Sequence, residues 1–142
     1  MNPLQRHVAC LVFAHDALAI ARGTGWERLY VRQTCPGGGG GEVAYRSGSK
    51  GITVDRSPDG PGVVTWAEFA DFIRSGLTDD LVLELEAAMA DWYRFNHVPA
   101  ERGDLTYESC TARFRELEAR IVANALAADD HAVQLDLFEV VA

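Results

Sequence analysis

The stretch GVVTWAEFADFIRSGL, residues 62–77, carries the clearest local signal in this chain of 142 residues. Thr65 and Glu68 have the spacing of a capping box, in which each side chain accepts a hydrogen bond from the other residue's backbone N–H. Gly76 is a residue that commonly follows the last turn of a helix. The pattern predicts a helix that begins after Thr65 and ends at Gly76.

This predicted helix has one apolar face. Val64 before the cap and Phe69 after the first turn are spaced as a hydrophobic staple. Trp66, Phe69, Ala70 and Ile73 then follow helical spacing along one side. We therefore expect this helix to pack against the core of the domain.

The residues before it predict a small antiparallel sheet. Three short segments, 27–33, 42–46 and 51–56, are rich in the residues that strands favour, and the first of them alternates apolar and polar residues. The last two are separated by Ser-Gly-Ser-Lys, which is typical of a tight turn. Five consecutive glycines, residues 37–41, predict a flexible loop between the first two strands.

Residues 3–22 predict an N-terminal helix. Pro3 suits a first turn, apolar residues recur at helical spacing, and Gly23 is a natural stop. A pair of strands hinged near His15 and Asp16 is the alternative, because Val-Ala-Cys-Leu-Val-Phe also suits a strand.

Two longer helices are predicted after residue 78, over residues 79–96 and 105–127. Both carry apolar residues at alternating steps of three and four, and the short loop between them predicts an antiparallel helical hairpin. The sequence thus predicts a single α+β domain over residues 1–128. It comprises an N-terminal helix, three antiparallel strands and three helices, and a C-terminal tail follows over residues 129–142.

Composition and motifs exclude several classes of protein. No apolar run approaches the roughly 18–20 residues that span a bilayer, and no basic leader precedes the apolar stretch near the N-terminus, so we expect no membrane partner. Three widely spaced cysteines, Cys10, Cys35 and Cys110, suit free thiols in a reducing cytoplasm. No phosphate-binding loop, zinc motif or catalytic motif occurs, so we expect no metal, no cofactor and no enzyme activity; a Cys35-dependent enzyme is the alternative.

Charge is divided unevenly between the two halves of the chain. Residues 1–76 hold eight basic and seven acidic residues, whereas residues 77–142 hold five and fourteen. A protein that mainly neutralises phosphates would not have this balance. The acidic half suits solvated helix faces, or an acidic protein-binding regulator or DNA-mimic inhibitor of the counter-defence type.

Basic and aromatic residues alternate along the predicted sheet. Such residues on one face stack bases and hold the backbone of single-stranded DNA. The other interpretation is that the tyrosines cover a small core and the basic residues keep the sheet soluble. The candidate residues are Arg28, Tyr30, Arg32, Tyr45, Arg46 and Lys50.

The segment Gln134-Leu135-Asp136-Leu137-Phe138 carries the most specific motif. It resembles, at every position, the pentapeptide by which bacterial DNA polymerases and mismatch-repair proteins dock onto the sliding clamp of DNA polymerase III. The resemblance covers five residues. It implies a plasmid- or phage-like accessory protein linked to DNA replication or repair, whose body binds single-stranded DNA or a second protein.

The resemblance also implies a role for each residue. Leu137 and Phe138 would fill a hydrophobic pocket of the clamp, Gln134 would hydrogen-bond in a smaller pocket, Leu135 would cover the surface between them, and Asp136 would stay mostly exposed. The alternative is an edge strand of the protein's own sheet, because residues 132–141 alternate in the manner of a strand.

Overall fold

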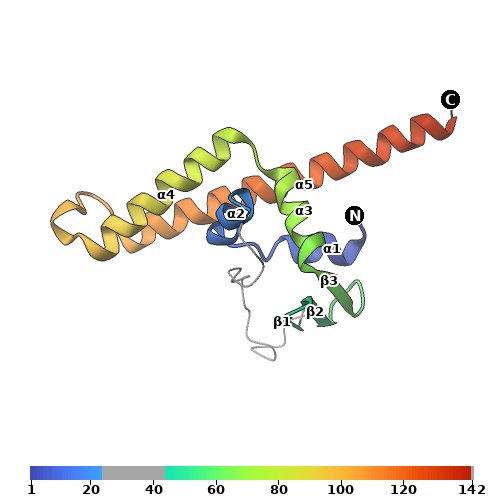
Figure 1. Ribbon diagram of the computed structural model, residues 1–142, viewed down its shortest axis with the longest axis horizontal. Coiled ribbons are helices and arrows are strands. Elements are labelled where there is room, and N and C mark those ends of the chain that lie inside the picture. Colours follow the sequence, from blue (N-terminus) through green and yellow to red (C-terminus); the bar gives the residue numbers. More distant parts are fainter. Residues whose placement is uncertain (24–43, 142) are drawn as a thin grey trace.

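The computed structural model describes residues 1–23 and 44–141, with residues 133–141 described by their backbone alone. Within these residues two short helices precede a three-stranded antiparallel sheet and three further helices (Figure 1), which confirms the predicted α+β class. The helices are α1 (Pro3–Ala9), α2 (Ala14–Ala21), α3 (Trp66–Gly76), α4 (Asp79–His97) and α5 (Tyr107–Val141), with a 3-10 turn at Pro99–Glu101; the strands are β1 (Ala44–Gly48), β2 (Gly51–Arg56) and β3 (Gly62–Thr65).

Helix α3 forms where the capping box predicts it. The Thr65 hydroxyl accepts from the Glu68 backbone N–H at 3.2 Å, and the Glu68 carboxylate accepts from the Thr65 N–H at 3.1 Å. The Trp66 indole N–H donates to the carbonyl of Gly48 at 2.7 Å, so the start of α3 is fastened to the turn between β1 and β2. The Trp66 hydrogen bond therefore helps to fix the position of the helix on the sheet.

Replacing Glu68 with Gln is expected to remove an acid-sensitive part of the stability. The backbone N–H of Thr65, then its hydroxyl and the Gln5 amide, lower the pKa of the Glu68 carboxyl below its ordinary value of 4.5. A carboxyl whose pKa is lowered on folding stabilises the fold above its unfolded pKa, and that contribution is lost as the pH falls through the folded value. Denaturant unfolding of both proteins between neutral pH and pH 3 measures this. The native chain should have the larger free energy of unfolding at neutral pH, and this difference should shrink below about pH 4.5. A difference that does not change with pH would contradict the prediction.

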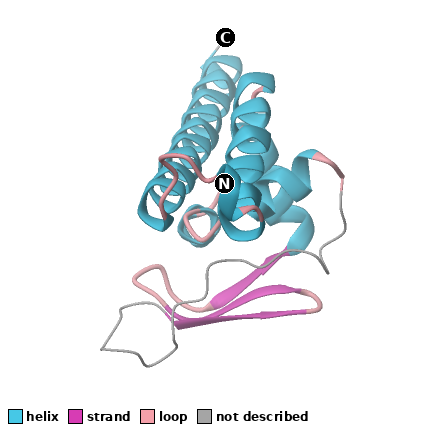
Figure 2. Cartoon of the chain, turned by 90° about the vertical axis from the view of Figure 1, so that its left-hand side faces the viewer, coloured by secondary structure: helices cyan, strands magenta, loops and turns pink. Residues whose placement is uncertain are grey.

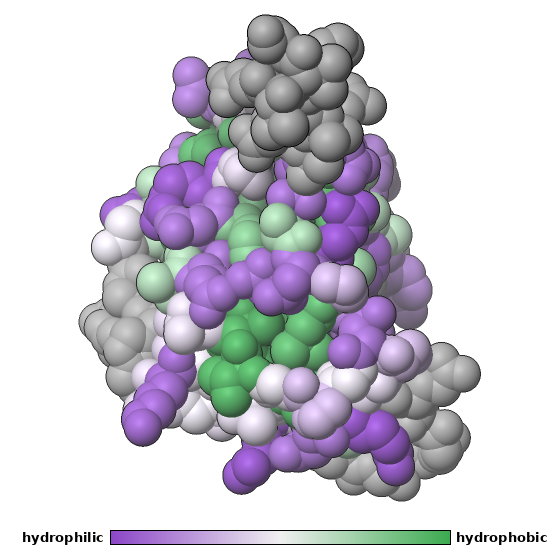
Figure 3. Space-filling model, turned by 90° about the vertical axis from the view of Figure 1, so that its right-hand side faces the viewer, coloured by the Kyte–Doolittle hydropathy of each residue, from purple (hydrophilic) through white to green (hydrophobic). Residues whose placement is uncertain are grey.

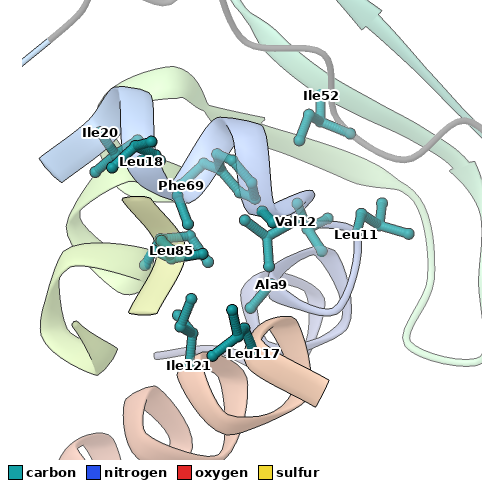
Figure 4. Packing of buried hydrophobic residues seen from close by; sticks show 14 of the residues in the cluster. Ala9, Leu11, Val12, Leu18, Ile20, Ile52, Phe69, Leu85, Leu117 and Ile121 are labelled. Atoms are coloured by element: carbon teal, nitrogen blue, oxygen red, sulfur yellow. The ribbon is translucent and has the colours of Figure 1, made fainter. Parts of the chain in front are cut away.

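The core lies between α3 and the helices around it. Figure 4 shows Phe69 of α3 and Val12 close to its centre, with Leu85 of α4 and Leu117 and Ile121 of α5 beside them. All five side chains are almost fully buried. Burial of this kind is the main stabilising contribution to a domain of this size.

Helices α3 and α5 cross at very short range. A Cβ atom added to Gly76 would lie 2.1 Å from the carbonyl oxygen of Ile121 and 2.9 Å from the backbone nitrogen of Ala125. The Asn124 amide donates to the Gly76 carbonyl at 3.2 Å at the same place. A side chain at position 76 would therefore force the two backbones apart.

The sheet has the order β1-β2-β3 and lies in a layer beside the helices (Figure 2). The prediction of strand 51–56 is confirmed residue for residue by β2, and β1 overlaps the predicted segment 42–46. The predicted strand 27–33 lies outside the described residues. Strand β3 was not predicted, because Val63 and Val64 are too short a run to show alternation; pairing of Ile52 with Val64 holds it on β2.

The prediction of one helix over residues 3–22 is wrong in one respect, because the chain breaks between α1 and α2. Phe13 has extended backbone, and its N–H donates to the Asp16 carboxylate at 3.1 Å, which begins α2. Residues 8–20 carry apolar side chains on every side, whereas one straight helix buries only one stripe. The break lets Leu11 and Val12 both turn into the core.

Helices α4 and α5 form the predicted antiparallel hairpin (Figure 1). The predicted end of the last helix near residue 127 is wrong, since α5 continues to Val141. No glycine or proline occurs between residues 107 and 141, and alanines, which are strong helix formers, fill much of residues 123–128. Figure 3 views the molecule from the side on which the C-terminal end of α5 lies. Apolar residues gather there between hydrophilic ones.

Candidate functional site

The predicted docking peptide, residues 134–138, lies in the last turns of α5. The backbone there is helical, so it does not form the edge strand that was the alternative. Ala125 is the last residue of α5 that is buried among those whose side chains are described, and Figure 1 shows α5 continuing beyond the other elements. The predicted roles of Gln134, Leu135, Asp136, Leu137 and Phe138 concern their side chains and stay predictions.

Ion pairs fasten α5 to α1 just before this peptide. The Arg6 guanidinium lies 3.0 Å from the carboxylate of Asp129 and 3.1 Å from that of Asp130. The N-terminal ammonium group lies 2.8 Å from Asp129. This ammonium group, and then Arg6, lower the pKa of the Asp129 carboxyl. The helix is thus held to the body up to residue 130.

The residues predicted to form a nucleic-acid-binding face do not all lie on the surface. Tyr45 is 3% exposed and packs in the core beneath the sheet, so the prediction that its ring stacks a base is wrong. The alternation of β1 turns Tyr45 inward opposite Val54. Arg46 and Lys50 are exposed, and Arg46 lies 3.4 Å from the Asp55 carboxylate. The other candidates, Arg28, Tyr30 and Arg32, lie outside the described residues, as does Cys35.

Many acidic residues of the C-terminal half have arginine partners within the chain. Asp91 binds Arg94 and, at 2.9 Å, Arg113. Glu84 lies 2.9 Å from Arg120, which joins α4 to α5. These pairs place arginine side chains beside acidic ones on the helical hairpin, and the fourteen acidic residues of residues 77–142 still outnumber its five basic ones.

An aromatic groove opens where α2, α4 and α5 meet. Trp92 of α4 lines it, and the Trp92 ring centroid lies 5.9 Å from that of Tyr107 and 5.7 Å from that of Phe114. Phe13 and His15 also line the groove, which has a volume of about 490 Å³, and the His15 ring lies 5.6 Å from that of Phe114. Trp92, Tyr107 and Phe114 belong to the apolar residues at alternating steps of three and four from which the sequence predicts the two helices. It did not predict that their rings would line an open groove, because nothing in the spacing shows how far the helices diverge.

A buried carboxylate, that of Glu118, also lines this groove. Glu118 is 5% exposed; it accepts from the Ala14 backbone N–H at 2.8 Å and from Arg115 at 2.8 and 3.1 Å. It therefore caps the first turn of α2 from across the core, while the Arg115 guanidinium lies 5.7 Å from the Phe13 ring. The sequence placed the acidic residues on solvent faces, so the role of Glu118 was missed.

The described residues offer little for covalent or metal chemistry. Within residues 1–23 and 44–132, no three His, Cys, Asp or Glu side chains lie close enough to hold a metal ion. Cys10 is exposed, Cys110 is buried, and both are free thiols. The aromatic groove is lined mainly by apolar and aromatic side chains, and Arg115 and Glu118 are paired within it.

Among the residues that the structure describes, no helix is both long enough and apolar enough to cross a bilayer. Comparisons with protein-family models, with curated proteins and with solved structures give no match.

Proposed function

We propose that this protein is a small bacterial accessory protein, of plasmid or phage type, that docks on the DNA polymerase sliding clamp through residues 134–138. The proposal places it in the cytoplasm and links it to DNA replication or repair. The observation that carries it is the five-residue match Gln-Leu-Asp-Leu-Phe at positions 134–138.

The position of the peptide along α5 supports the proposal. It begins nine residues after Ala125, the last buried residue among those of α5 whose side chains are described. Residues 127, 128, 131 and 132 are exposed, so α5 has left the core before the peptide begins. An isolated helical end of this length is marginally stable in water, and its last turns open at low cost. The peptide can therefore adopt an extended form when it meets a groove.

Two apolar anchors supply the expected affinity. Burial of a Leu or Phe side chain contributes about 1.5–3 kcal/mol each. Ordering of the peptide and loss of overall freedom offset much of that gain, which leaves a dissociation constant of roughly micromolar order. Such a value suits exchange with other proteins on the clamp.

Calorimetric titration of the full chain into a purified bacterial clamp tests the proposal. Leu137→Ala combined with Phe138→Ala should weaken binding at least about 100-fold, because both anchors are lost. Val140→Ala with Val141→Ala is the matched control, since it removes apolar side chains from the same segment outside the motif. Because the contacts are apolar, raised salt should change the affinity little.

Two results would contradict the proposal. One is the absence of heat and of any complex between the native chain and the clamp at about 100 µM. The other is equal affinity for the native chain and the Leu137→Ala, Phe138→Ala variant, which would locate binding elsewhere. Both variants should unfold at the same temperature as the native chain, because Ala125 is the last buried residue among those of α5 whose side chains are described, and the changed positions follow it by at least twelve residues.

A further inference from the structure

The aromatic groove where α2, α4 and α5 meet has the size and the composition of a small-molecule site. Its volume of about 490 Å³ lies within the range of roughly 300–1,000 Å³ that ligand pockets occupy. Its accessible rings come from three elements and are those of Phe13 and His15 beside the start of α2, Trp92 of α4 and Tyr107 of α5. An aromatic ring in the groove can therefore contact several other rings at once.

The more exposed charge of the groove is positive. The Arg115 side chain is 52% exposed, whereas that of its partner Glu118 is 7% exposed. Among the residues that the structure describes, the guanidinium donates to Glu118 through Nη1, so N–H groups on Nε and Nη2 can donate to a ligand. The Glu118 carboxylate also accepts from the Ala14 N–H at 2.8 Å, so its own oxygens are engaged inside the protein.

Helix α2 adds to the preference for an anion. Phe13 and His15 both line the groove, so the N-terminal end of α2, which carries the partial positive charge of the helix dipole, lies beside it. His15 is exposed, and its imidazole carries at least one N–H donor. Donors from α2 and from α5 therefore line a groove whose other side chains are mainly aromatic.

We propose that this groove binds a small aromatic carboxylate, with the ring of the ligand against Trp92 and Tyr107 and its carboxylate on the Arg115 guanidinium. A carboxylate accepts charge-assisted hydrogen bonds from a guanidinium, which a neutral aromatic compound cannot do. A cationic ligand is disfavoured because Arg115 would repel it. Glu118 is a positioning residue, since its ion pair holds the guanidinium at the groove.

Calorimetric titration of the full chain with indole-3-acetate tests this proposal, and the uncharged indole-3-acetamide is the matched ligand. A probe of this size should bind with a dissociation constant of roughly 100 µM. The amide should bind at least about tenfold more weakly, because it cannot form the ion pair with Arg115. The groove lies outside residues 134–138 and the titration needs no clamp, so this proposal and the docking on the clamp fail or succeed independently.

Two exposed tyrosines locate the binding. Tyr107→Ala removes a ring that is 58% exposed and lines the groove, and it should weaken the binding of indole-3-acetate at least about fivefold. Tyr93→Ala is the control: it removes a ring of α4 that is 61% exposed and is not part of the groove lining, so the affinity should not change. Because both rings are exposed, both variants should fold as the native chain does.

Two arginine variants test the contact with the carboxylate. Arg115→Gln should bind indole-3-acetate no more tightly than indole-3-acetamide, and a purely structural role of Arg115 would not remove this preference. Arg113→Gln should keep the preference, because Arg113 lies on the same helix but pairs with Asp91 and does not line the groove.

Three results would overturn the proposal. The first is the absence of binding at about 2 mM indole-3-acetate. The second is equal affinity of the native chain for the acid and the amide, which would make the groove an apolar surface without an anion site. The third is a Tyr107→Ala protein that binds indole-3-acetate as tightly as the native chain.

Discussion

Replacing Gly76 with Ala is expected to destabilise the protein by more than about 3 kcal/mol, which is a large part of the stability of an ordinary domain. The new Cβ atom would lie 2.1 Å from the carbonyl oxygen of Ile121 and 2.9 Å from the backbone nitrogen of Ala125. Both neighbours are backbone atoms inside α5, so neither can rotate away. The helices would have to separate at the point where α3 meets α5.

The expected direction of the change in stability is informative, because it is opposite to the usual one. Within a helix, Gly→Ala ordinarily stabilises by up to about 1 kcal/mol, because alanine has the higher helix propensity. Gly48→Ala is the control, since a Cβ atom there meets nothing within 4 Å. Denaturant unfolding of the two variants separates the effects. A Gly76→Ala protein as stable as the native chain would show that α3 and α5 do not approach as described.

Replacing Glu118 with Ala is expected to cost about 3 kcal/mol. The change removes the acceptor of the Ala14 N–H and the partner of Arg115, and it leaves a polar backbone group buried without its acceptor. Exchange of the Ala14 amide hydrogen with solvent should become faster, because the first turn of α2 loses its cap.

Two further variants identify the cause of this loss. Glu118→Gln keeps an oxygen that can accept from Ala14 but loses the charge, so its stability should lie between those of the native chain and Glu118→Ala. Glu116→Ala removes an exposed carboxyl two positions away and should change the free energy of unfolding by less than about 0.5 kcal/mol. Equal stability of Glu118→Ala and Glu116→Ala would contradict the assigned role.

Local signals made part of the fold predictable. The capping box of Thr65 and Glu68 acts over three residues, so the sequence alone locates the start of α3. The bounds of β2 follow in the same way from its residue types and the turns around it. The heptad spacing of α4 and α5 is likewise a property of neighbouring turns.

Features that depend on distant residues were not predictable. The break between α1 and α2 arises because Leu11 and Val12 both find burial against other elements. Tyr45 is buried because its side chain packs in the same core. Glu118 gains its role from a backbone N–H 104 residues away, and no local pattern identifies such a partner. For the docking peptide, by contrast, the sequence motif is the whole basis of the prediction.

The hydrogen bond between Ala14 and Glu118 also has a consequence for the order of folding. It joins the second helix of the chain to the last, and α5 is synthesised after every element that it covers. Contacts of such long sequence separation form slowly, because a large loop must close before they contribute. The nascent chain therefore exposes the apolar faces of α2 and α3 until α5 has emerged. During that interval the growing chain is the form most open to aggregation and to capture by chaperones.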